Sequence, residues 1–445
     1  MIQTSSANAL NAINDYLKIE YPEGMRNEFN SMEALINFLQ KDTLTGKYKE
    51  KMFGLGIVDN MRALGALPLD SGLGDSGGLN DKYAISIADL EVGTGAENVT
   101  ARFDVTKFMN TFSVTDEALL IGTTDGSLYD TVKDNLNRMN MGLKHTQARM
   151  TYGGKSGIIG AVKTIVDGPA IAGKVVIKVT CANVNSLLPG MQVMLHKSGT
   201  EYIQGKIWQK AAVTLSSDPV LYLLVDEFGS GIADKAALLL LTATDFTVYS
   251  RQFRAAAGVK REYQGLNDIL IASPTTLFGV DLSVYEQLKP TVEPLADSIL
   301  TEQKLDEMAD HVALHNSDDT MIDMIVSSFA IISTIKQQFY SFKQYDMDSS
   351  SADFKMGRKD VVYDGYRFHK DKYSRDANVY MLDTKQIGEL LRKDFGWLTA
   401  GREGILERRD GTEIYEAIMT KYGDFYLEAW KAHAAFTGAK ESAAA

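Results

Sequence analysis

The sequence predicts an α+β protein of 445 residues, made of several parts that differ in hydrophobic pattern. Residues 127–152 repeat apolar side chains at helical spacing. Residues 83–114 and 156–258 alternate apolar and polar side chains, with turn residues between the runs, as β-strands do. The chain after residue 300 carries both patterns. At roughly 100–200 residues per domain, this length suits two to four domains.

The clearest helix is predicted over residues 127–152. Ser127 and Asp130 form a start similar to a capping box, and Gly153-Gly154 supply the stop. Between them the apolar residues recur three or four positions apart: Leu128, Val132, Leu136, Met139 and Leu143. At about 1.5 Å per residue the helix would run to nearly 40 Å. A narrow apolar stripe on so long a helix is typical of a strut lying across a flat subunit.

The region before this helix is predicted to be an arm followed by a β-ribbon. Residues 1 to about 60 have short amphipathic helical patterns, and a glycine-rich stretch then leads into alternating runs. A ribbon would have almost no hydrophobic core of its own to pack against. Its apolar residues would therefore expose a hydrophobic face unless another subunit covered it; they include Tyr83, Ile85, Phe103 and Phe108.

Residues 156–258 form a separate block in which turn signals recur at about 8–12 residues, as in an all-β unit. Strands are predicted near 175–179, 193–195, 222–226 and 236–241. Because the block lies between a helix and a mixed region, an inserted β domain is the simplest interpretation.

The remaining chain is predicted to mix helices and strands. Thr301 can cap a helix, and a strand over 322–326 leads into a helix that reaches residue 339. Further strands are expected at 361–368 and 379–382. The helix after Thr301 has one apolar face, formed by Leu305, Met308, Ala309 and Val312.

Composition excludes several classes of protein. The 46 Lys+Arg against 58 Asp+Glu give a net charge of 46 − 58 = −12, which argues against a protein that grips nucleic-acid phosphates. The single cysteine, Cys181, cannot form an internal disulfide and is interpreted as a small core residue. No stretch has the ~18 apolar residues of a membrane helix, and the first residues lack a secretory pattern. We expect no membrane partner and a protein that stays where it is made.

Three glycine-containing strings imitate catalytic or phosphate-binding motifs. Gly74–Gly78 reads GDSGG, as around the serine of trypsin-like proteases, but no histidine precedes Ser76. Gly72–Gly77 fits G-x-G-x-x-G, but a strand pattern follows where a dinucleotide site needs a helix. Gly154-Lys155 lacks the phosphate-loop glycine five residues earlier, where Arg149 stands, so a helix C-cap is the preferred interpretation.

The titratable residues do not form a recognisable active site either. His311 and His315 have a spacing that can hold a metal, yet no glutamate of the zinc-protease kind lies between them. The pairs Glu302/Asp306 and Asp306/Asp310 have ordinary helix-surface spacing. We therefore expect no catalytic residue, cofactor or metal. The sequence favours a function in assembly over a function in catalysis.

The order of parts resembles that of the major capsid proteins of tailed bacteriophages, the family with the Hong-Kong-97-like fold. Several short segments are similar to segments of that family, and together they are moderately specific. They are 108–118 before the long helix, 262–266 at the return from the insertion, 380–383, 409–417, 431–433 and Gly438. The resemblance spans most of the chain after residue 65.

The resemblance implies a division of the chain into an N-terminal arm (1–63), an extended loop (64–115), a peripheral domain (116–155 and 259–299) with the spine helix 127–152, an inserted β domain (156–258), an axial domain (300–390) and a C-terminal return to the peripheral domain (391–445). It implies pentamers and hexamers that close into an icosahedral shell around double-stranded DNA, without sequence-specific DNA contact. The implied location is the virion capsid, assembled in the bacterial host cytoplasm.

The resemblance also implies partners and leaves alternatives. The main partner is the chain itself; scaffolding, portal and decoration proteins are further implied partners. Residues proposed to contact other subunits are Tyr83, Ile85, Phe103, Phe108, Leu128, Val132 and Met139. A cellular nanocompartment shell of the same fold is the first alternative. An unrecognised hydrolase using the Gly74–Gly78 loop, and another virion component, are the others.

Overall fold

The structure is a computed structural model of the chain. It describes the following residues: 35, 38–46, 48–54, 98–117, 127–171, 173–182, 187–198, 201–211, 219–229, 231–250, 262–272, 274–315, 322–339, 362–363, 366–374, 377–398 and 405–440. Side chains are described for α5 from Leu136 onward, except that of Asn140. No helix in this described part is long and apolar enough to cross a membrane.

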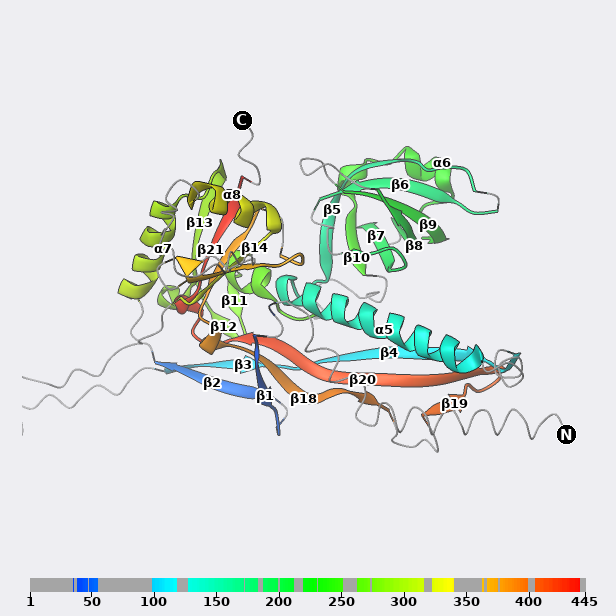
Figure 1. The fold of residues 1–445 in the computed structure, drawn as a ribbon, viewed down its shortest axis with the longest axis horizontal. Coiled ribbons are helices and arrows are strands. Elements are labelled where there is room, and N and C mark those ends of the chain that lie inside the picture. Colours follow the sequence, from blue (N-terminus) through cyan, green and yellow to red (C-terminus); the bar gives the residue numbers. More distant parts are fainter. Residues whose placement is uncertain are drawn as a thin grey trace, which may run out of the picture.

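A long helix lying along a sheet forms the frame of the molecule (Figure 1). Helix α5 spans Ser127–Tyr152, the bounds predicted from its apolar stripe and glycine stop. The sheet is made of β1 (Gln40–Thr43), β18 (Ile387–Trp397), β20 (Ile414–Leu427), β19 (Leu406–Arg408) and β4 (Thr106–Thr115). The helix packs on it through Leu136, which is fully buried, and through Met139 and Leu143 beside it.

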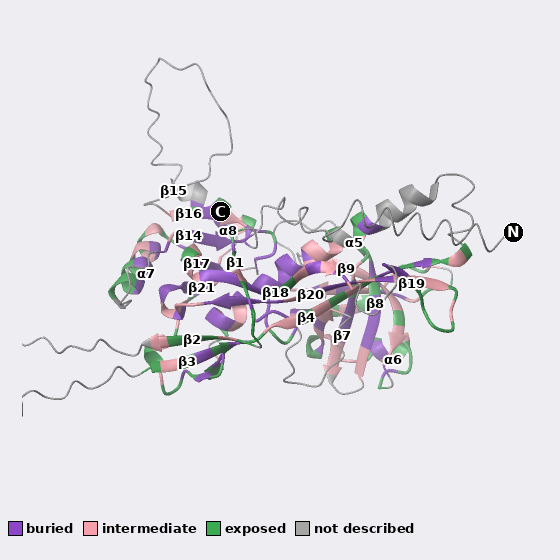
Figure 2. Ribbon diagram, turned by 90° about the horizontal axis from the view of Figure 1, so that it is seen from below, coloured by how far each residue is buried: buried purple, intermediate pink, exposed green. Residues whose placement is uncertain are grey.

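The pairing in this sheet joins distant parts of the chain. All ten residues of β4 pair antiparallel with β20, so that Thr106 lies opposite Gly423 and Thr115 opposite Ile414. On its other side β20 pairs with β18 and β19. The final segment of the chain therefore completes the body to which α5 belongs. Figure 2 shows β18 and β20 as largely buried strands.

The N-terminal region departs from the helical prediction. Residues 40–43 form strand β1, which runs parallel to β18, and β2 (Lys49–Gly54) pairs antiparallel with β3 (Asn98–Phe103). The helical interpretation of residues 1 to about 60 was thus wrong for the strands at 40–43 and 49–54, because strand partners far along the chain decide their conformation. The alternating residues Tyr83 and Ile85 lie outside the described residues.

A second sheet of six strands forms a lobe at one end of the frame (Figure 1). Its order is β13 (Thr291–Ser298), β21 (Ala434–Ala439), β17 (Val379–Leu382), β14 (Met324–Ser327), β16 (Tyr366–Lys370) and β15 (Val362–Tyr363). Helices α7 (Glu302–His315) and α8 (Phe329–Phe339) lie on it. The four predicted apolar residues of α7, Leu305, Met308, Ala309 and Val312, are all buried there, which confirms that face.

The predicted inserted β unit is a closed six-stranded barrel, in the order β10-β5-β6-β9-β8-β7. Its strands are β5 (Ile158–Asp167), β6 (Val176–Cys181), β7 (Gln192–Ser198), β8 (Glu201–Lys210), β9 (Val220–Phe228) and β10 (Thr247–Ser250). It has its own core, in which Cys181 is completely buried. The cysteine is thus the core residue that the sequence predicted.

One strand prediction in the barrel region is wrong. Residues 236–241 belong to a short helix, α6 (Lys235–Leu239), and the turn after it. Asp234 caps this helix by accepting a hydrogen bond from Ala237 N–H at 2.8 Å. A short apolar run is ambiguous between strand and helix, and the N-cap decides it here.

The other described elements are short. Strands β11 (Thr276–Leu277) and β12 (Val280–Asp281) form a small hairpin, and Asn267–Ile271 form a π-helical turn. Single 3₁₀ turns lie at Ala243–Asp245, Glu286–Leu288, Thr384–Gln386 and Trp430–Ala432.

Candidate functional site

The end of α5 is fixed to the segment that returns from the barrel by a buried ion pair. Arg149 donates from Nη1 to Glu262 Oε2 at 2.9 Å and from Nη2 to Glu262 Oε1 at 2.5 Å. Glu262 is completely buried. Three residues later, a Cβ on Gly265 would lie 2.5 Å from the carbonyl oxygens of Met150 and Thr151, so only glycine allows this close approach.

A second buried charge cluster joins α5 to the sheet. Glu389 Oε1 on β18 accepts hydrogen bonds from Gln147 Nε2 at 2.6 Å and Tyr263 O–H at 2.8 Å, and Lys421 Nζ lies 2.6 Å away. The side chains of Glu389 and Lys421 are each only 2% exposed. Lys421 also lies 3.8 Å from Asp394 Oδ1. One carboxylate thus holds the helix, the return segment and β20 together.

Asp371 holds the N-terminal segment against the lobe. Its Oδ2 accepts from Tyr152 O–H at 2.7 Å and from Leu35 N–H at 3.0 Å, and its Oδ1 accepts from Tyr373 N–H at 2.9 Å. Burial, with the Asp371 carboxylate beside it, raises the pKa of Tyr152 well above its usual value, so this phenol remains a donor. Asp371 thereby joins the last residue of α5, which is 219 positions away from it in the chain, to Leu35, which is 336 positions away.

The β2–β3 ribbon has one face packed against the body. Phe103 is 1% exposed and lies against Phe278 and Tyr426, with ring centroids 4.5 and 5.7 Å away, and Phe53 lies 4.8 Å from the ring of Trp430. The expectation that Phe103 exposes an uncovered face is therefore wrong for this chain alone. The opposite face of the ribbon is open, where Met52 is 67% exposed.

A charge cluster fixes the base of the ribbon. Lys49 Nζ lies 2.6 Å from Asp42 Oδ2 and 3.0 Å from Glu428 Oε1, and Lys51 Nζ lies 2.5 Å from Glu428 Oε2. Burial alone would raise the pKa of Glu428, but the two lysines outweigh it and leave that pKa below its usual value. The pKa of Asp42 is also lowered, first by its hydrogen bond with Lys49 and then by that with Tyr426.

Glu428→Gln is expected to loosen the ribbon without unfolding the body, because the aromatic contacts of Phe53 and Phe103 remain. These pairs are partly exposed, so we expect a local loss of about 1 kcal/mol, or roughly fivefold faster hydrogen exchange in β2 and β3. Because both carboxylate pKa values are lowered on folding, the wild-type contribution is present above pH ~4 and lost as the pH falls further. Hydrogen-exchange mass spectrometry measures the exchange rates of β2 and β3. Equal rates in the variant and in wild type would contradict the prediction.

His433 is a buried titratable group in the lobe. Its Nδ1 accepts from Asp383 N–H at 3.2 Å, and burial lowers the pKa of His433 to about 3. The folded state therefore favours the neutral imidazole. Stability from this group is complete above the unfolded pKa of about 6.5 and falls as the pH drops toward 3.

His433→Asn is expected to remove this pH dependence, because Asn can accept the same hydrogen bond and does not titrate. At pH ~4.5 wild type should lose about 2–3 kcal/mol relative to neutral pH from this residue, and the variant should not. Thermal unfolding of both proteins across this range gives the difference. Parallel pH profiles would contradict the assignment.

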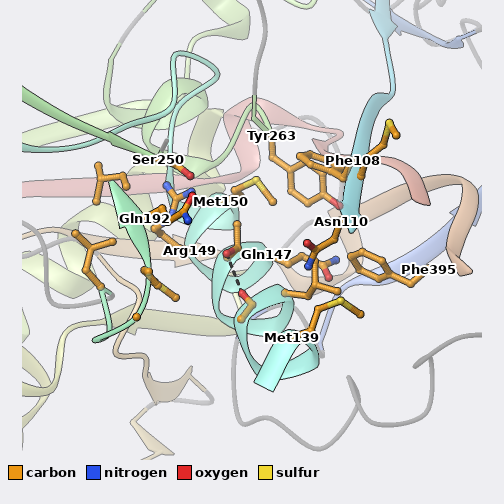
Figure 3. A pocket seen from close by; sticks show the side chains of 18 of the residues that line it. Phe108, Asn110, Met139, Gln147, Arg149, Met150, Gln192, Ser250, Tyr263 and Phe395 are labelled. Carbon is orange, nitrogen blue, oxygen red and sulfur yellow. Dashed lines mark hydrogen bonds between the residues drawn. The ribbon is translucent and has the colours of Figure 1, made fainter. Parts of the chain in front are cut away.

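A groove of about 470 Å³ lies between α5, β4 and the barrel (Figure 3). The helix contributes Met139, Gly142, Leu143 and Met150, and β4 contributes residues 108–111. The barrel side is formed by residues from 187–192 and by Ser250. Phe395 and Tyr263 also line it. About half of the lining side chains are apolar, and the polar ones are amides, hydroxyls and the Arg149 guanidinium.

The residues expected to contact other subunits fall in different settings. Phe108 is half-buried and its ring lies 5.1 Å from that of Tyr263, whereas Met139 packs partly against the core under α5. Both line the groove. Tyr83 and Ile85 lie outside the described residues, as do the side chains of Leu128 and Val132. Subunit contact remains a prediction for all seven residues.

The structure gives no catalytic role to the motif-like strings that it describes. Gly72–Gly78 lie outside the described residues. Helix α5 ends at Tyr152, directly before Gly153-Gly154, and Lys155 N–H donates to Asp268 Oδ2 at 2.6 Å. His311 lies exposed on α7 near Thr291. In the described part of the chain no three His, Cys, Asp or Glu residues are grouped to hold a metal ion.

The sequence analysis did not identify the buried charged residues that join α5 to the return segment, the sheet and the lobe. These are Arg149, Glu262, Glu389, Lys421 and Asp371. Apart from the Tyr373 N–H that Asp371 accepts, their partners are more than 20 residues away, so no local spacing marks these residues. The one available signal for Glu262 was its place in the string 262–266.

No family model matches this chain, and no curated protein matches it. Solved structures do. They include a cyanophage A-1(L) capsid asymmetric unit (10% identity, TM-score 0.48, covering 92% of this chain and 94% of that one). The capsid of Myoviridae phage XM1 (7%, 0.41, 91% and 90%) and the holo-SrpI encapsulin complex of Synechococcus elongatus PCC 7942 (7%, 0.38, 91% and 86%) also match. The resemblance stated from the sequence thus recurs among solved structures.

Proposed function

We propose that this chain is a shell-forming protein with the Hong-Kong-97-like fold, and specifically the major capsid protein of a tailed bacteriophage. The observation that supports it best is the pairing of β20 with β4 beneath α5. The resemblance implies that residues 391–445 return to the body built around the helix 127–152, and β20 comes from that range. In Figure 1 the lobe lies at one end of this frame, and the inserted barrel lies above α5.

The distribution of apolar surface also supports assembly. Exposed apolar side chains occur on the ribbon (Met52), the sheet edge (Met109), α5 (Met141), the barrel (Leu240) and α7 (Leu314). A shell subunit has neighbours on several sides, so it needs contact surfaces on every part. In this proposal each subunit contact buries around 800 Å² per partner, and the shell is stable because such contacts add up.

The purified chain is expected to form capsomers, tubes or closed shells. Sedimentation velocity and electron microscopy measure this directly. A small discrete oligomer with enzymatic activity would contradict the proposal. Nuclease-protected DNA in native particles would support the phage capsid, whereas particles with a protein cargo and no DNA would support the nanocompartment alternative. Ser76→Ala should leave assembly unchanged, and loss of a hydrolytic activity in that variant would support the hydrolase alternative.

A further inference from the structure

Lys421 lies between two acidic side chains of β18 in the helix–sheet body. Its Nζ is 2.6 Å from Glu389 Oε1 and 3.8 Å from Asp394 Oδ1. The side chains of Lys421 and Glu389 are 2% exposed, and that of Asp394 is 18% exposed. The amine thus has one carboxylate within hydrogen-bond distance and a second almost in contact, although one would be enough for an ion pair.

A β-bulge places Asp394 next to the lysine. The register of β18 against β20 shifts between Lys393 and Gly396. Within this shift two residues of β18, Asp394 and Phe395, lie opposite the single residue Lys421. A bulge of this kind changes the direction in which a side chain points. Here it brings the Asp394 carboxylate toward the amine, and it places the Phe395 ring centroid 4.7 Å from Nζ.

The lysine side chain reaches Glu389 along one face of β20. Successive side chains of a strand alternate between its faces, so Lys421, Gly423 and Phe425 share a face. Glu389 is the residue of β18 that pairs with Phe425. A Cβ on Gly423 would lie 2.9 Å from Leu391 Cδ2 and 3.4 Å from Lys421 Cε. Glycine at this position therefore leaves the space through which the lysine extends to Glu389.

The Asp394 carboxyl group has neighbours that suit attack by a nucleophile. Asp394 Oδ1 accepts from Phe395 N–H at 2.9 Å, and Lys41 Nζ lies 3.7 Å from Asp394 Oδ2. An N–H donor and a cation stabilise the negative charge that develops on the carboxyl oxygens when a nucleophile adds to the carbon. Glu389 is held beside Nζ by the hydrogen bonds that it accepts from α5 and from the segment returning from the barrel. Lys421 is thus a possible nucleophile, Asp394 its electrophile and Glu389 a proton carrier.

We propose that the folded chain forms an amide bond between Lys421 Nζ and Asp394 Cγ. Glu389 takes one proton from the ammonium group and passes it to the Asp394 carboxylate, so that a neutral amine meets a carboxylic acid. Nζ then attacks Cγ, and a second proton moves from Nζ through Glu389 to Oδ2. The Cγ–Oδ2 bond breaks and water leaves. The nitrogen keeps its third hydrogen, Oδ1 becomes the amide oxygen, and Glu389 is regenerated.

The fold favours this condensation in two ways. It holds the amine and the carboxyl group almost in contact, which turns a reaction between separate molecules into an intramolecular one. The product also has one positive and one negative charge fewer in a site largely shielded from water, where charges are costly, and its amide N–H can still donate to Glu389. The inference rests on the side chains of β18 and β20 and stands independently of the shell proposed above. The ion pair of Lys421 with Glu389 belongs to the chain before this step. Asp394→Ala keeps that pair and is the background in which its own stability can be measured.

Intact-mass spectrometry of the denatured full chain tests the bond. Wild type should be lighter than its sequence by the mass of one water molecule, and trypsin should release one linked peptide that contains both Lys421 and Asp394. Asp394→Ala and Glu389→Gln should have the masses of their sequences. Asp394→Asn is the most specific variant, because attack on its amide carbon releases ammonia in place of water. The linked form of this variant should therefore have the same mass as linked wild type.

Lys304 and Glu293 are the matched control pair, because they are 2.7 Å apart but partly exposed to solvent. Their tryptic peptides should remain unlinked. Circular dichroism checks that the variants fold, and the two Asp394 variants keep the test valid if Glu389→Gln does not. Folded wild type with the full mass of its sequence would overturn the proposal, and so would a loss of water in Asp394→Ala. A loss of water in folded Glu389→Gln would overturn the role of Glu389 as the proton carrier.

Discussion

Lys421→Met is expected to lower the free energy of unfolding of the helix–sheet body by about 3–5 kcal/mol. Lys421 Nζ is the cation nearest the buried Glu389 carboxylate, at 2.6 Å, and both side chains are shielded from water. Methionine fills a similar volume but leaves the carboxylate without its counter-charge. Gln147 and Tyr263 still donate to Glu389, which limits the loss without replacing the cation.

The double variant Lys421→Met/Glu389→Gln should recover most of this loss, because it removes both charges of the pair together. Lys289→Met is the matched surface control: Lys289 pairs with the exposed Glu286, and its removal should change stability by less than about 0.5 kcal/mol. Urea unfolding followed by circular dichroism gives the comparison. A single variant within about 1 kcal/mol of wild type would show that water reaches Glu389.

Local patterns predicted the elements that depend mainly on neighbouring residues. The helix Ser127–Tyr152 and the strand Val379–Leu382 have the expected bounds, because their periodicity and stop signals lie within the elements themselves. The face of α7 that carries Leu305 and Met308 was predictable for the same reason. The inserted β unit followed from regularly spaced turns, although closure into a barrel did not.

Long-range pairing could not be predicted in this way. Strands β4 and β20 are separated by about 300 residues, and the sequence of either is compatible with other partners. The same applies to β1 and β2, which were interpreted as part of a helical arm. Buried Lys421 and Glu389 were missed because charged residues are usually on the surface, and only the fold brings them together.

Arg149→Met is expected to weaken the attachment of the return segment, residues 262–271, to the end of α5. Glu262 is completely buried and receives two parallel hydrogen bonds from the guanidinium, so the variant leaves an unpaired carboxylate. We expect a loss of about 3–5 kcal/mol. Hydrogen exchange should increase most in residues 262–271, since Gly265 packs directly on the last turn of the helix.

Arg149→Lys should fall between wild type and Arg149→Met, because lysine keeps the charge but cannot form the two-pronged contact. Arg102→Met is the matched control, since Arg102 pairs with Glu50 on the exposed side of the ribbon. It should change stability by less than about 0.5 kcal/mol. If Arg149→Lys matched wild type in exchange over 262–271, charge alone would hold the segment, and the two-pronged geometry would have no role in fixing the barrel to the frame.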